Sequence, residues 1–471
     1  MPNPSLHNLA EGVDKLPLAE DLRTVLGPKH VRTELGERMA YAYDATGEKH
    51  LPDVVAFPGS PEEVASCLRL ARRYRTPVVV RGAGTNLSGG TVPIRGGLVL
   101  NLLRMDRILS IDPLRRRAVV EPGITNGRLN QHLRPLGLQF APDPSSMAVC
   151  TIGGNIAENA GGPHCLKYGV TTGHVVALQV ATAQGELVEL TDDDLYDLRG
   201  LVIGSEGTLG VVTRATLRLT PVPAAARTLL AVYDDLYAAG RSVSGIIAAG
   251  IIPAALELMD HENLVLTRQA GYGAFPEQAE AALIIEVDGD PEDLDDEITA
   301  IEAICRQEGA VAVQAAETEA ERAEIWRGRR ANFGVLAQSS PFVWTQDVTV
   351  PRHRLPEMLQ EVAEIGRRFG LKIATVAHAG DGNLHPTIPF NPRNTMERER
   401  VRKADHAVVA ACLRLGGSIT GEHGVGLDKL PGMVQMFSAS QLVLMARVRR
   451  AFDPEGLLNP GKLLPSPKGG F

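Results

Sequence analysis

Residues 78–90 read VVVRGAGTNLSGG, a β-branched run followed at once by a loop that contains four glycines. Successive glycines allow backbone N–H groups to converge on an anion. The side chains of Thr85, Asn86 and Ser88 add further hydrogen-bond donors. No helical pattern opens after the loop, so it is not the G-x-G-x-x-G motif of dinucleotide-binding βαβ units. Taken alone, the loop could equally be a glycine-rich turn without a ligand.

Three further segments strengthen the anion-binding interpretation. The run PDPSS at 142–146 precedes a glycine- and amide-rich loop, TIGGNIAENAGG, at 151–162. The next such segment is GSEGTLGVV at 204–212, and the last is NPGK at 459–462. Glycine serves where backbone must approach another group closely. Its density in the first half of the chain therefore predicts a large, flat, anionic ligand enclosed by backbone.

Composition excludes several classes of protein. The 471 residues are 44% hydrophobic and carry a net charge of −8, which fits a globular protein and argues against a nucleic-acid footprint. No apolar run approaches the roughly 18 residues of a transmembrane helix, and the first residues do not resemble a secretory signal. Five scattered cysteines without a C-x-x-C pair exclude a cysteine-ligated zinc site and a ferredoxin-type cluster. They favour a reducing, cytoplasmic compartment.

The second half of the chain has a different pattern. The segment PVPAAA at 221–226 is typical of a linker. The order that follows resembles a ferredoxin-like βαββαβ unit: strand 228–233, helix 235–249, strands 254–259 and 282–287, helix 291–308 and strand 310–315. Further on, the pattern predicts helices at 318–336, 355–369 and 396–415, and two short strands around a glycine turn at 380–382.

A histidine-rich motif, HAGDGNLH, occupies 378–385, and TGEHGVG follows at 420–426. On one straight strand, histidines seven positions apart would point to opposite faces. The Gly-Asp-Gly turn folds the segment back, so both rings can face one point. Two histidines with one carboxylate form an open three-ligand site that suits zinc or a similar divalent ion. A single histidine is more often structural, but this clustering favours a site.

An arginine-rich segment, WRGRR, lies at 326–330 on an expected helix. A planar guanidinium suits bidentate binding of a carboxylate. Three arginines within four positions could also be a solvated helix face.

In this order, the glycine motifs resemble those of FAD-binding proteins of the vanillyl-alcohol oxidase type. Within that superfamily the chain is similar, from about 35 to 465, to the FAD-linked D-2-hydroxyacid dehydrogenases, which include catalytic subunits of glycolate oxidases. The resemblance implies an α+β fold with an FAD-binding domain at 35–221. It also implies a cap domain on an antiparallel, ferredoxin-like sheet at 222–415, and a C-terminal segment, 416–471, that returns to the FAD domain.

The resemblance also implies which residues contact FAD. These are Arg81, Gly82, Ala83, Gly84, Thr85, Asn86, Ser88, Gly89, Gly90, Pro142, Asp143, Ser145, Ser146, Thr151, Gly153, Gly154, Asn155, Ala157, Asn159, Glu206, Gly207, Gly210, Val211, Val212 and Asn459. Relatives with covalent FAD carry a histidine where this chain has Thr85, so we expect non-covalent FAD.

For the substrate, the resemblance implies a metal ion bound by His378, His385 and Glu422. Arg329 is then the carboxylate clamp, Asn383 a substrate contact and His423 the base. The expected reaction is oxidation of a short D-2-hydroxy acid to the 2-oxo acid, with metal-assisted loss of the hydroxyl proton and hydride transfer to FAD.

The substrate is expected to be glycolate or D-lactate. The D-2-hydroxyglutarate branch adds a threonine four residues after the arginine and a lysine two residues before a strand aspartate. Here those positions are Phe333 and Thr345, and neither carries a positive charge. A D-2-hydroxyglutarate dehydrogenase and a non-catalytic flavin subunit remain alternatives. A zinc hydrolase and the ether-lipid synthase branch are disfavoured.

The sequence contains no motif for the electron acceptor. We expect an acceptor protein or a quinone, with partner subunits or a homodimer. We also expect a protein that is cytoplasmic or peripheral to the inner membrane, binds no nucleic acid and has no transmembrane segment.

Overall fold

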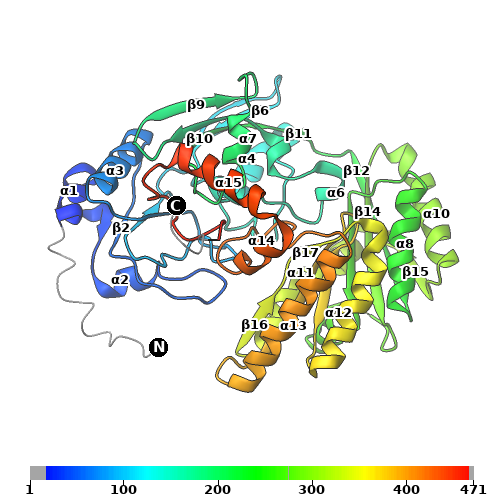
Figure 1. Ribbon diagram of the computed structural model, residues 1–471. Coiled ribbons are helices and arrows are strands. Elements are labelled where there is room, and N and C mark those ends of the chain that lie inside the picture. Colours follow the sequence, from blue (N-terminus) through cyan, green and yellow to red (C-terminus); the bar gives the residue numbers. More distant parts are fainter. Residues whose placement is uncertain (1–16, 274, 466–471) are drawn as a thin grey trace. The chain divides into compact units, whose positions relative to one another are not determined.

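A computed structural model describes residues 17–273 and 275–465 (Figure 1). The chain forms two compact units. Unit 1 contains residues 17–161, 170–222 and 422–465 of the described chain, and unit 2 contains 162–169 and 223–421. These units differ from the segments drawn from the sequence, because 17–34 belongs to unit 1, 162–169 belongs to unit 2, and unit 1 resumes only at Glu422.

Unit 1 holds two main sheets. The first has the order β1 (Val31–Arg32), β2 (Val54–Ala56), β4 (Leu98–Asn101) and β3 (Val78–Arg81). Strand β4 runs parallel to both of its neighbours. The C-terminal segment returns to the free edge of this sheet, since Val78 N donates to Leu457 O (2.8 Å) and Asn459 N donates to Val78 O (2.7 Å).

Helices α1 (Pro17–Leu26) and α3 (Pro61–Arg73) contribute to the core of the first sheet. Helix α3 begins with an N-cap, because the Ser60 hydroxyl accepts the Glu63 N–H and Pro61 occupies the first turn. Its buried residues recur at helical spacing, and they are Val64, Ala65, Cys67, Leu68 and Ala71.

The second sheet of unit 1 is antiparallel. Its order is β5 (Ile108–Asp112), β6 (Arg117–Val120), β10 (Val211–Arg218), β8 (Val175–Ala181) and β9 (Leu187–Thr191). Unit 1 also contains helices α4 (Asn126–Leu133) and α7 (Leu198–Val202). Two short strands, β7 (Leu138–Gln139) and β11 (Thr220–Pro221), pair with each other.

The expectation of a loop throughout 151–162 was wrong. Residues 152–158 form helix α5 (Ile152–Glu158), whose N-cap is Thr151. The glycines obscured the helix because glycine is an unfavourable helix residue. At Gly153 it is required by packing, since a Cβ there would lie 2.6 Å from the Pro122 side chain. Other helices lacked a prediction, among them α2 (Leu35–Met39), α9 (His261–Gln269), α14 (Leu430–Met436) and α15 (Ala439–Phe452).

Unit 2 is built on one antiparallel sheet. Its strands, in spatial order, are β15 (Ala312–Ala315), β12 (Ala225–Tyr233), β14 (Ala281–Gly289), β13 (Ala255–Asp260), β18 (Ala374–His378), β19 (Asn383–Phe390) and β16 (Phe342–Thr345), and β17 (Val348–Thr349) also pairs with β19. The first four strands have the order of a ferredoxin-like unit, which confirms that prediction.

The two faces of this sheet differ in chemistry. One face forms an apolar core with α8 (Leu236–Ala248), α10 (Pro291–Gln307), α12 (Leu355–Phe369) and α13 (Thr395–Arg414). The other packs on α9 and on α11 (Glu319–Ser339), which contribute Leu264 and Trp326.

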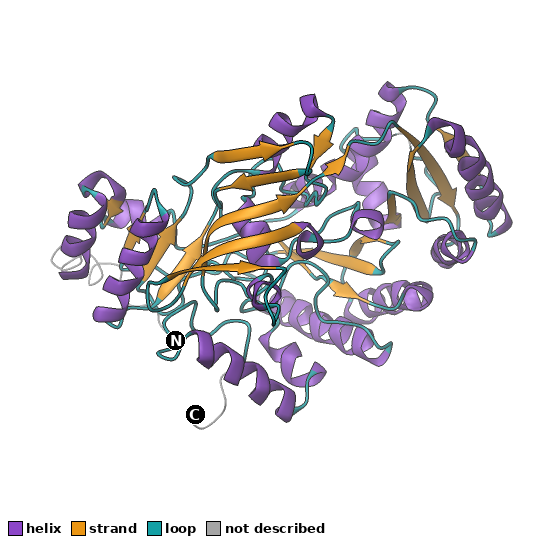
Figure 2. Cartoon of the chain, turned by 90° about the horizontal axis from the view of Figure 1, so that it is seen from above, coloured by secondary structure: helices purple, strands orange, loops and turns teal. Residues whose placement is uncertain are grey.

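Figure 2 distinguishes the strands and helices by colour. No helix among the described residues is both long and apolar enough to cross a bilayer.

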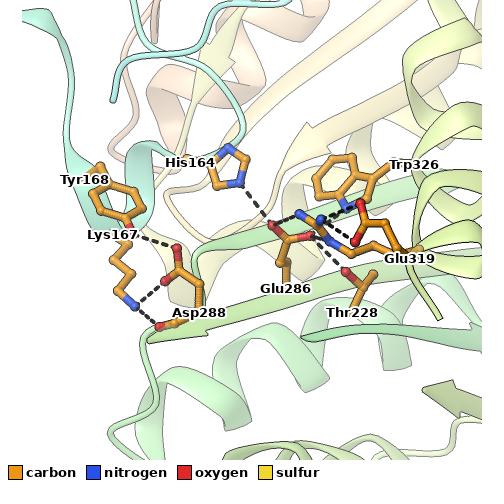
Figure 3. Close-up of polar contacts among 9 residues, drawn as sticks. His164, Lys167, Tyr168, Thr228, Glu286, Asp288, Glu319 and Trp326 are labelled. Carbon is orange, nitrogen blue, oxygen red and sulfur yellow. Dashed lines mark hydrogen bonds and ion pairs between the residues drawn. The ribbon is translucent and has the colours of Figure 1, made fainter. Parts of the chain in front are cut away.

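Residues 162–169 contact strand β14 of unit 2 through helix α6 (Cys165–Tyr168) (Figure 3). The Lys167 ammonium donates to the Asp288 carbonyl (2.5 Å) and pairs with its carboxylate. The Tyr168 hydroxyl donates to the same carboxylate at 2.6 Å. These contacts satisfy a buried aspartate with donors from a segment 120 residues away in the chain.

Glu286, also on β14, is a second buried carboxylate in Figure 3. It accepts from Thr228 Oγ1 and Trp326 Nε1, both at 2.8 Å, and from Arg322 Nε and Nη2, both at 3.0 Å. His164 Nε2 lies 3.5 Å from Glu286 Oε1. Burial alone would raise the pKa of Glu286, but the hydrogen bonds from His164 and Arg322 outweigh burial and hold the pKa at about 2.

We expect Glu286→Gln to destabilise unit 2 by on the order of 3 kcal/mol at neutral pH, because the wild-type pKa lies well below the ordinary value of 4.5. A depressed pKa stabilises the fold above pH 4.5, and this stabilisation is lost as pH falls toward 2. The variant should lack that part of the pH dependence. Urea unfolding followed by tryptophan emission measures it, since both tryptophans, Trp326 and Trp344, lie in unit 2.

Glu319→Gln is the matched control, because Glu319 pairs with the same Arg322 but its side chain is 79% exposed. It should leave stability almost unchanged. Equal losses in the two variants would contradict the assignment of the pH-dependent stability to Glu286.

Candidate functional site

In unit 1, the C-terminal motif NPGK holds the first glycine loop in place. Asn459 Nδ2 donates to the Gly90 carbonyl (2.9 Å) and to the Glu206 carbonyl (2.7 Å). Lys462 Nζ donates to the same Gly90 carbonyl and to Asn459 Oδ1, both at 2.7 Å. Three segments far apart in sequence therefore meet at buried polar side chains.

Glu206 fixes the turn at the end of the TGEHGVG segment, residues 420–426. Its two carboxylate oxygens accept the backbone N–H groups of Val425 (2.7 Å) and Gly426 (2.8 Å). Burial raises the pKa of Glu206, and these two N–H groups oppose the rise. The sequence predicts Glu206 as a cofactor contact; the structure uses its carboxylate to bind this turn.

Glu158 approaches the same turn. A Cβ on Gly424, where φ is +84°, would lie 2.5 Å from Glu158 Oε2 and 2.8 Å from Glu206 Oε1, so glycine is required there. Burial, followed by the charge of Glu206, raises the pKa of Glu158 well above its usual value. Burial also lowers the pKa of nearby Lys462 to about 7. Burial in unit 1 therefore shifts both Glu158 and Lys462 toward their neutral forms.

The first glycine loop is closely packed. A Cβ on Gly82 would lie 2.3 Å from Thr151 Oγ1. Gly84 has φ +76°, and a Cβ there would lie 2.0 Å from the Arg81 guanidinium. Arg81 Nη1 itself donates to the Tyr43 carbonyl at 2.8 Å. Asn86 Oδ1 accepts from Gly90 N (2.6 Å) and from Ser88 N (3.0 Å), which closes the loop on itself.

The remaining predicted cofactor residues differ in exposure. Val211 and Val212 are buried in hydrophobic clusters. Asn159 ends α5 at φ +53°, and its side chain accepts from Thr172 N at 2.8 Å. Ser145 is exposed, and the following residues are half-buried: Ala83, Thr85, Asp143, Ser146, Gly154, Ala157 and Gly207.

In unit 2, the two histidines of the HAGDGNLH motif lie side by side. Strands β18 and β19 pair antiparallel, with His378 opposite Asn383 and Val376 opposite His385. The histidine side chains share one face, and their ring centroids are 5.1 Å apart. The prediction that the Gly-Asp-Gly turn brings these rings together is confirmed.

Glu257, on the neighbouring strand β13, joins His378 to the arginine-rich helix. Its Oε1 lies 2.6 Å from His378 Nδ1, and its Oε2 lies 2.8 Å from Arg329 Nε and 2.7 Å from Arg329 Nη2. Burial alone would raise the pKa of Glu257, but the charges of His378 and Arg329 outweigh it and lower the pKa. Glu257 was not predicted from the sequence. Its only signal was a single acid within the otherwise apolar strand 254–259.

The three arginines of the WRGRR segment have different surroundings. Arg327 pairs with Glu324 on the same helix, and its side chain is 51% exposed. Arg330 lies over the Trp326 ring, 5.5 Å from its centroid. Arg329 is only 11% exposed and faces the sheet. Of these three arginines, Arg329 is the one that contacts Glu257, which in turn contacts His378.

Asp347 and Asn383 lie at the other side of the histidine pair. Asp347 Oδ2 accepts from Thr420 Oγ1 (2.6 Å) and Gly421 N (3.0 Å), and its Oδ1 is 3.9 Å from His385 Nδ1. Asn383 Oδ1 is buried and has no hydrogen-bond partner among the described residues. Glu422 and His423 follow Gly421 directly in the chain and belong to unit 1.

Known proteins match nearly all of this chain. Residues 52–191 match an FAD binding domain, and residues 222–463 match the C-terminal domain of FAD-linked oxidases. The chain belongs to the FAD-linked oxidases. It is 42% identical over 419 residues to the glycolate oxidase subunit GlcD of Escherichia coli, with 88% of this chain and 84% of that protein covered. It is 32% identical over 453 residues to the D-lactate dehydrogenase of Anaerostipes hadrus, with 93% and 95% covered.

A solved structure of p-cresol methylhydroxylase has the same fold. It superimposes on this FAD-linked oxidase with a TM-score of 0.82 at 16% identity, and 98% of each chain is covered. The α+β fold of the vanillyl-alcohol oxidase type is therefore confirmed, as is the FAD-linked family.

The loops of this FAD-linked oxidase fit an anionic cofactor such as FAD. The amide nitrogens of Asn86 and Asn155 are buried, and neither has a hydrogen-bond partner within the described part of the chain. A buried donor without a partner costs free energy. Two such donors beside the glycine loops suit a ligand that offers acceptor oxygens, as a pyrophosphate does.

We expect Gly426→Ala to lower the FAD content of the purified protein. Gly426 has φ +49°, and a Cβ there would lie 2.0 Å from the Ser88 carbonyl, so the substitution must displace the first glycine loop. The ratio of absorbance near 450 nm to that at 280 nm measures FAD per chain.

Gly456→Ala is the matched control in the same unit. Gly456 also has a positive φ, +67°, but no atom lies within 4 Å of its Cβ position. It should carry a similar backbone strain of about 1 kcal/mol and keep its FAD. Equal FAD content in the two variants would contradict the importance of the Gly426–Ser88 contact.

Proposed function

We propose that this protein oxidises a short D-2-hydroxy acid, glycolate or D-lactate, to the corresponding 2-oxo acid. Its cofactors would be non-covalent FAD and a divalent ion, zinc or a similar metal, held by His378, His385 and Glu422. The observation that carries the proposal is that Glu257 contacts both the Arg329 guanidinium and the His378 imidazole. The names of the relatives, a glycolate oxidase subunit and a D-lactate dehydrogenase, support the same substrate class.

The chemistry of the donor set supports a divalent ion. Two buried imidazoles with centroids 5.1 Å apart match the ligands that zinc and similar ions prefer. His378 Nδ1 lies 2.6 Å from a carboxylate oxygen of Glu257, an arrangement typical of metal-binding histidines. His385 Nδ1 lies 3.9 Å from Asp347 Oδ1, which is longer than a hydrogen bond. The ion would lower the pKa of a substrate hydroxyl, and FAD would take up the hydride.

The chain's own residues would then bind the substrate and move one proton. Arg329 would bind the substrate carboxylate, since a guanidinium forms paired hydrogen bonds with a carboxylate. The Asn383 side chain, whose Oδ1 is buried without a partner among the described residues, would contact the hydroxy acid. A neutral His423 ring nitrogen would accept the hydroxyl proton, because imidazole titrates near neutral pH.

The surroundings of Arg329 support a monocarboxylate. Phe333 lies one turn further along α11, on the same side as Arg329, and is 52% exposed. Thr345, on β16, carries no charge either. A second carboxylate on the substrate would lack a cationic partner at either position.

We propose further that electrons leave to an acceptor protein or a quinone, and that the chain associates with partner subunits or with itself. The word "subunit" in the relative's name supports an assembly. All five cysteines are free thiols, which supports a cytoplasmic, reducing environment.

We expect anaerobic addition of glycolate or D-lactate to bleach the flavin absorbance near 450 nm, and prior treatment with a metal chelator to abolish the bleaching. L-lactate and D-2-hydroxyglutarate serve as comparisons and should react more slowly. Reduction by D-2-hydroxyglutarate alone would contradict the proposed substrate. FAD that no hydroxy acid reduces would indicate a non-catalytic subunit.

We expect acid precipitation of the protein to release the flavin into the supernatant, because the FAD is proposed to be non-covalent. A yellow pellet would contradict non-covalent attachment.

We expect Arg329→Lys to raise the KM for the hydroxy acid at least about tenfold, because an ammonium cannot reproduce the paired hydrogen bonds of a guanidinium. Stopped-flow reduction over a range of substrate concentrations measures this. Arg327→Lys on the same helix is the control, since Arg327 pairs with Glu324 at the surface. Equal KM values for the two variants would remove Arg329 as the clamp.

A further inference from the structure

Glu257 contacts two functional candidates with one carboxylate. Its Oε1 lies 2.6 Å from His378 Nδ1, and its Oε2 accepts from Arg329 Nε at 2.8 Å. The Glu257 side chain is fully buried, and those of His378 and Arg329 are 5% and 11% exposed. These three side chains come from two strands and one helix, and all lie within unit 2.

The placement of Glu257 follows from strand register. Strand β13 lies between β14 and β18, and Glu257 is directly opposite His378 on β18. Side chains opposite one another on neighbouring strands share a face and lie close together. The same face is covered by α11, which carries Arg329. Glu257 therefore occupies a position where it can reach both partners.

Glu257 differs from the structural acid Glu286 in that both of its partners, His378 and Arg329, are candidates for the functional site. Burying a charged pair costs several kcal/mol per ion, and an apolar residue of similar volume often gives equal or greater stability. Its chain neighbours Leu256 and Leu258 are apolar and belong to the hydrophobic core on the opposite face of the sheet. What distinguishes Glu257 is therefore what its carboxylate does to its two partners.

The carboxylate determines the tautomer of His378. A carboxylate accepts hydrogen bonds, so the short contact places a proton on Nδ1 and leaves Nε2 as the nitrogen with a lone pair. Metal-binding histidines commonly have this arrangement, and the carboxylate also fixes the orientation of the ring.

The same carboxylate orients Arg329. It contacts the Nε and Nη2 edge of the guanidinium. The planar group then presents its Nη1 side in a defined direction. Because both partners bind one carboxylate, Glu257 couples the orientation of the guanidinium to that of the imidazole.

We propose that Glu257 is a positioning residue that holds the metal ligand His378 and the carboxylate clamp Arg329 in a single geometry. The inference rests on the proposed function, because the metal ion and the hydroxy acid are the two groups that this geometry would serve. Glu257 itself touches neither of them.

The Glu257→Gln variant tests the proposal. An amide oxygen can still accept from Arg329, but its NH2 group then faces His378 Nδ1. The ring must accept there, which moves its proton to Nε2. We expect the affinity for Mn²⁺ to fall 10- to 100-fold, the range found when such carboxylates are removed. We also expect a higher KM for the hydroxy acid.

Glu286→Gln is the matched control. Glu286 is a buried glutamate on the neighbouring strand β14, and it also pairs with an arginine of α11, Arg322 (Figure 3). Its other partners are Thr228, Trp326 and His164, and none of these is assigned to the metal. This variant should lose stability and keep wild-type affinity for Mn²⁺.

The experiment uses the full-length, FAD-loaded protein after chelator treatment. Mn²⁺ is titrated in and the free ion is followed by electron paramagnetic resonance, with a thermal melt of each sample. A wild-type protein with a tight site that Glu257→Gln weakens and Glu286→Gln does not would support the proposal. Equal Mn²⁺ affinity and equal KM in wild type and Glu257→Gln would overturn it.

A wild-type protein that binds no Mn²⁺ or Zn²⁺ would overturn the proposed metal centre itself, so the two failures are distinguishable. Should Glu257→Gln not fold, Glu257→Asp provides the same test. Its shorter side chain keeps the charge but cannot reach both partners at their present distances, so it should also weaken Mn²⁺ binding. Wild-type affinity in Glu257→Asp would then overturn the proposal.

Discussion

A buried carboxylate must be given donors, and this constraint organises the functional face of unit 2. Glu257, Glu286 and Asp288 project from β13 and β14 toward the face that α9 and α11 cover, while the other face is apolar. An unpaired charge there would cost several kcal/mol. Each acid is therefore satisfied by a distant segment: Glu257 by Arg329 and His378, Glu286 by Arg322 and Trp326, and Asp288 by Lys167 and Tyr168. These contacts hold helix α11, which carries Arg322 and Arg329, and helix α6 beside the acids.

Unit 1 uses the same principle with backbone groups. Glu206 binds the N–H groups of the turn at 425–426, and Asn459 and Lys462 bind the carbonyls of the glycine loops. The glycines are needed because these segments approach within contact distance, as Gly426 approaches Ser88. Specialised side chains thus position the loops, and the backbone remains available to a flat anionic ligand. The glycine loops need such ties, since glycine itself contributes no packing.

Much of the fold could be predicted from the sequence, because its signals are local. Period-2 and period-3.6 patterns predicted the ferredoxin-like strand order and helix α12, and the Gly-Asp-Gly turn predicted that His378 and His385 meet. Helix α5 was missed because its glycines oppose helix formation locally, and the N-cap at Thr151 and packing against Pro122 decide the outcome. The roles given to Glu422, His423 and the flavin contacts stay predictions, as does the identity of the metal.

Glycine spacing, the two histidines of one hairpin and the WRGRR segment were visible in the sequence because each is a short-range pattern. From them the family, an FAD-linked oxidase, and the type of fold followed. The sequence could not single out Arg329 by exposure or find Glu257 at all, because their contact spans 72 positions. Alternation along a strand indicates which face a residue occupies, but not which side chain from another element lies opposite. Only the register of β13 with β18 and the packing of α11 brought Glu257 to both partners, and that arrangement is a property of the tertiary structure.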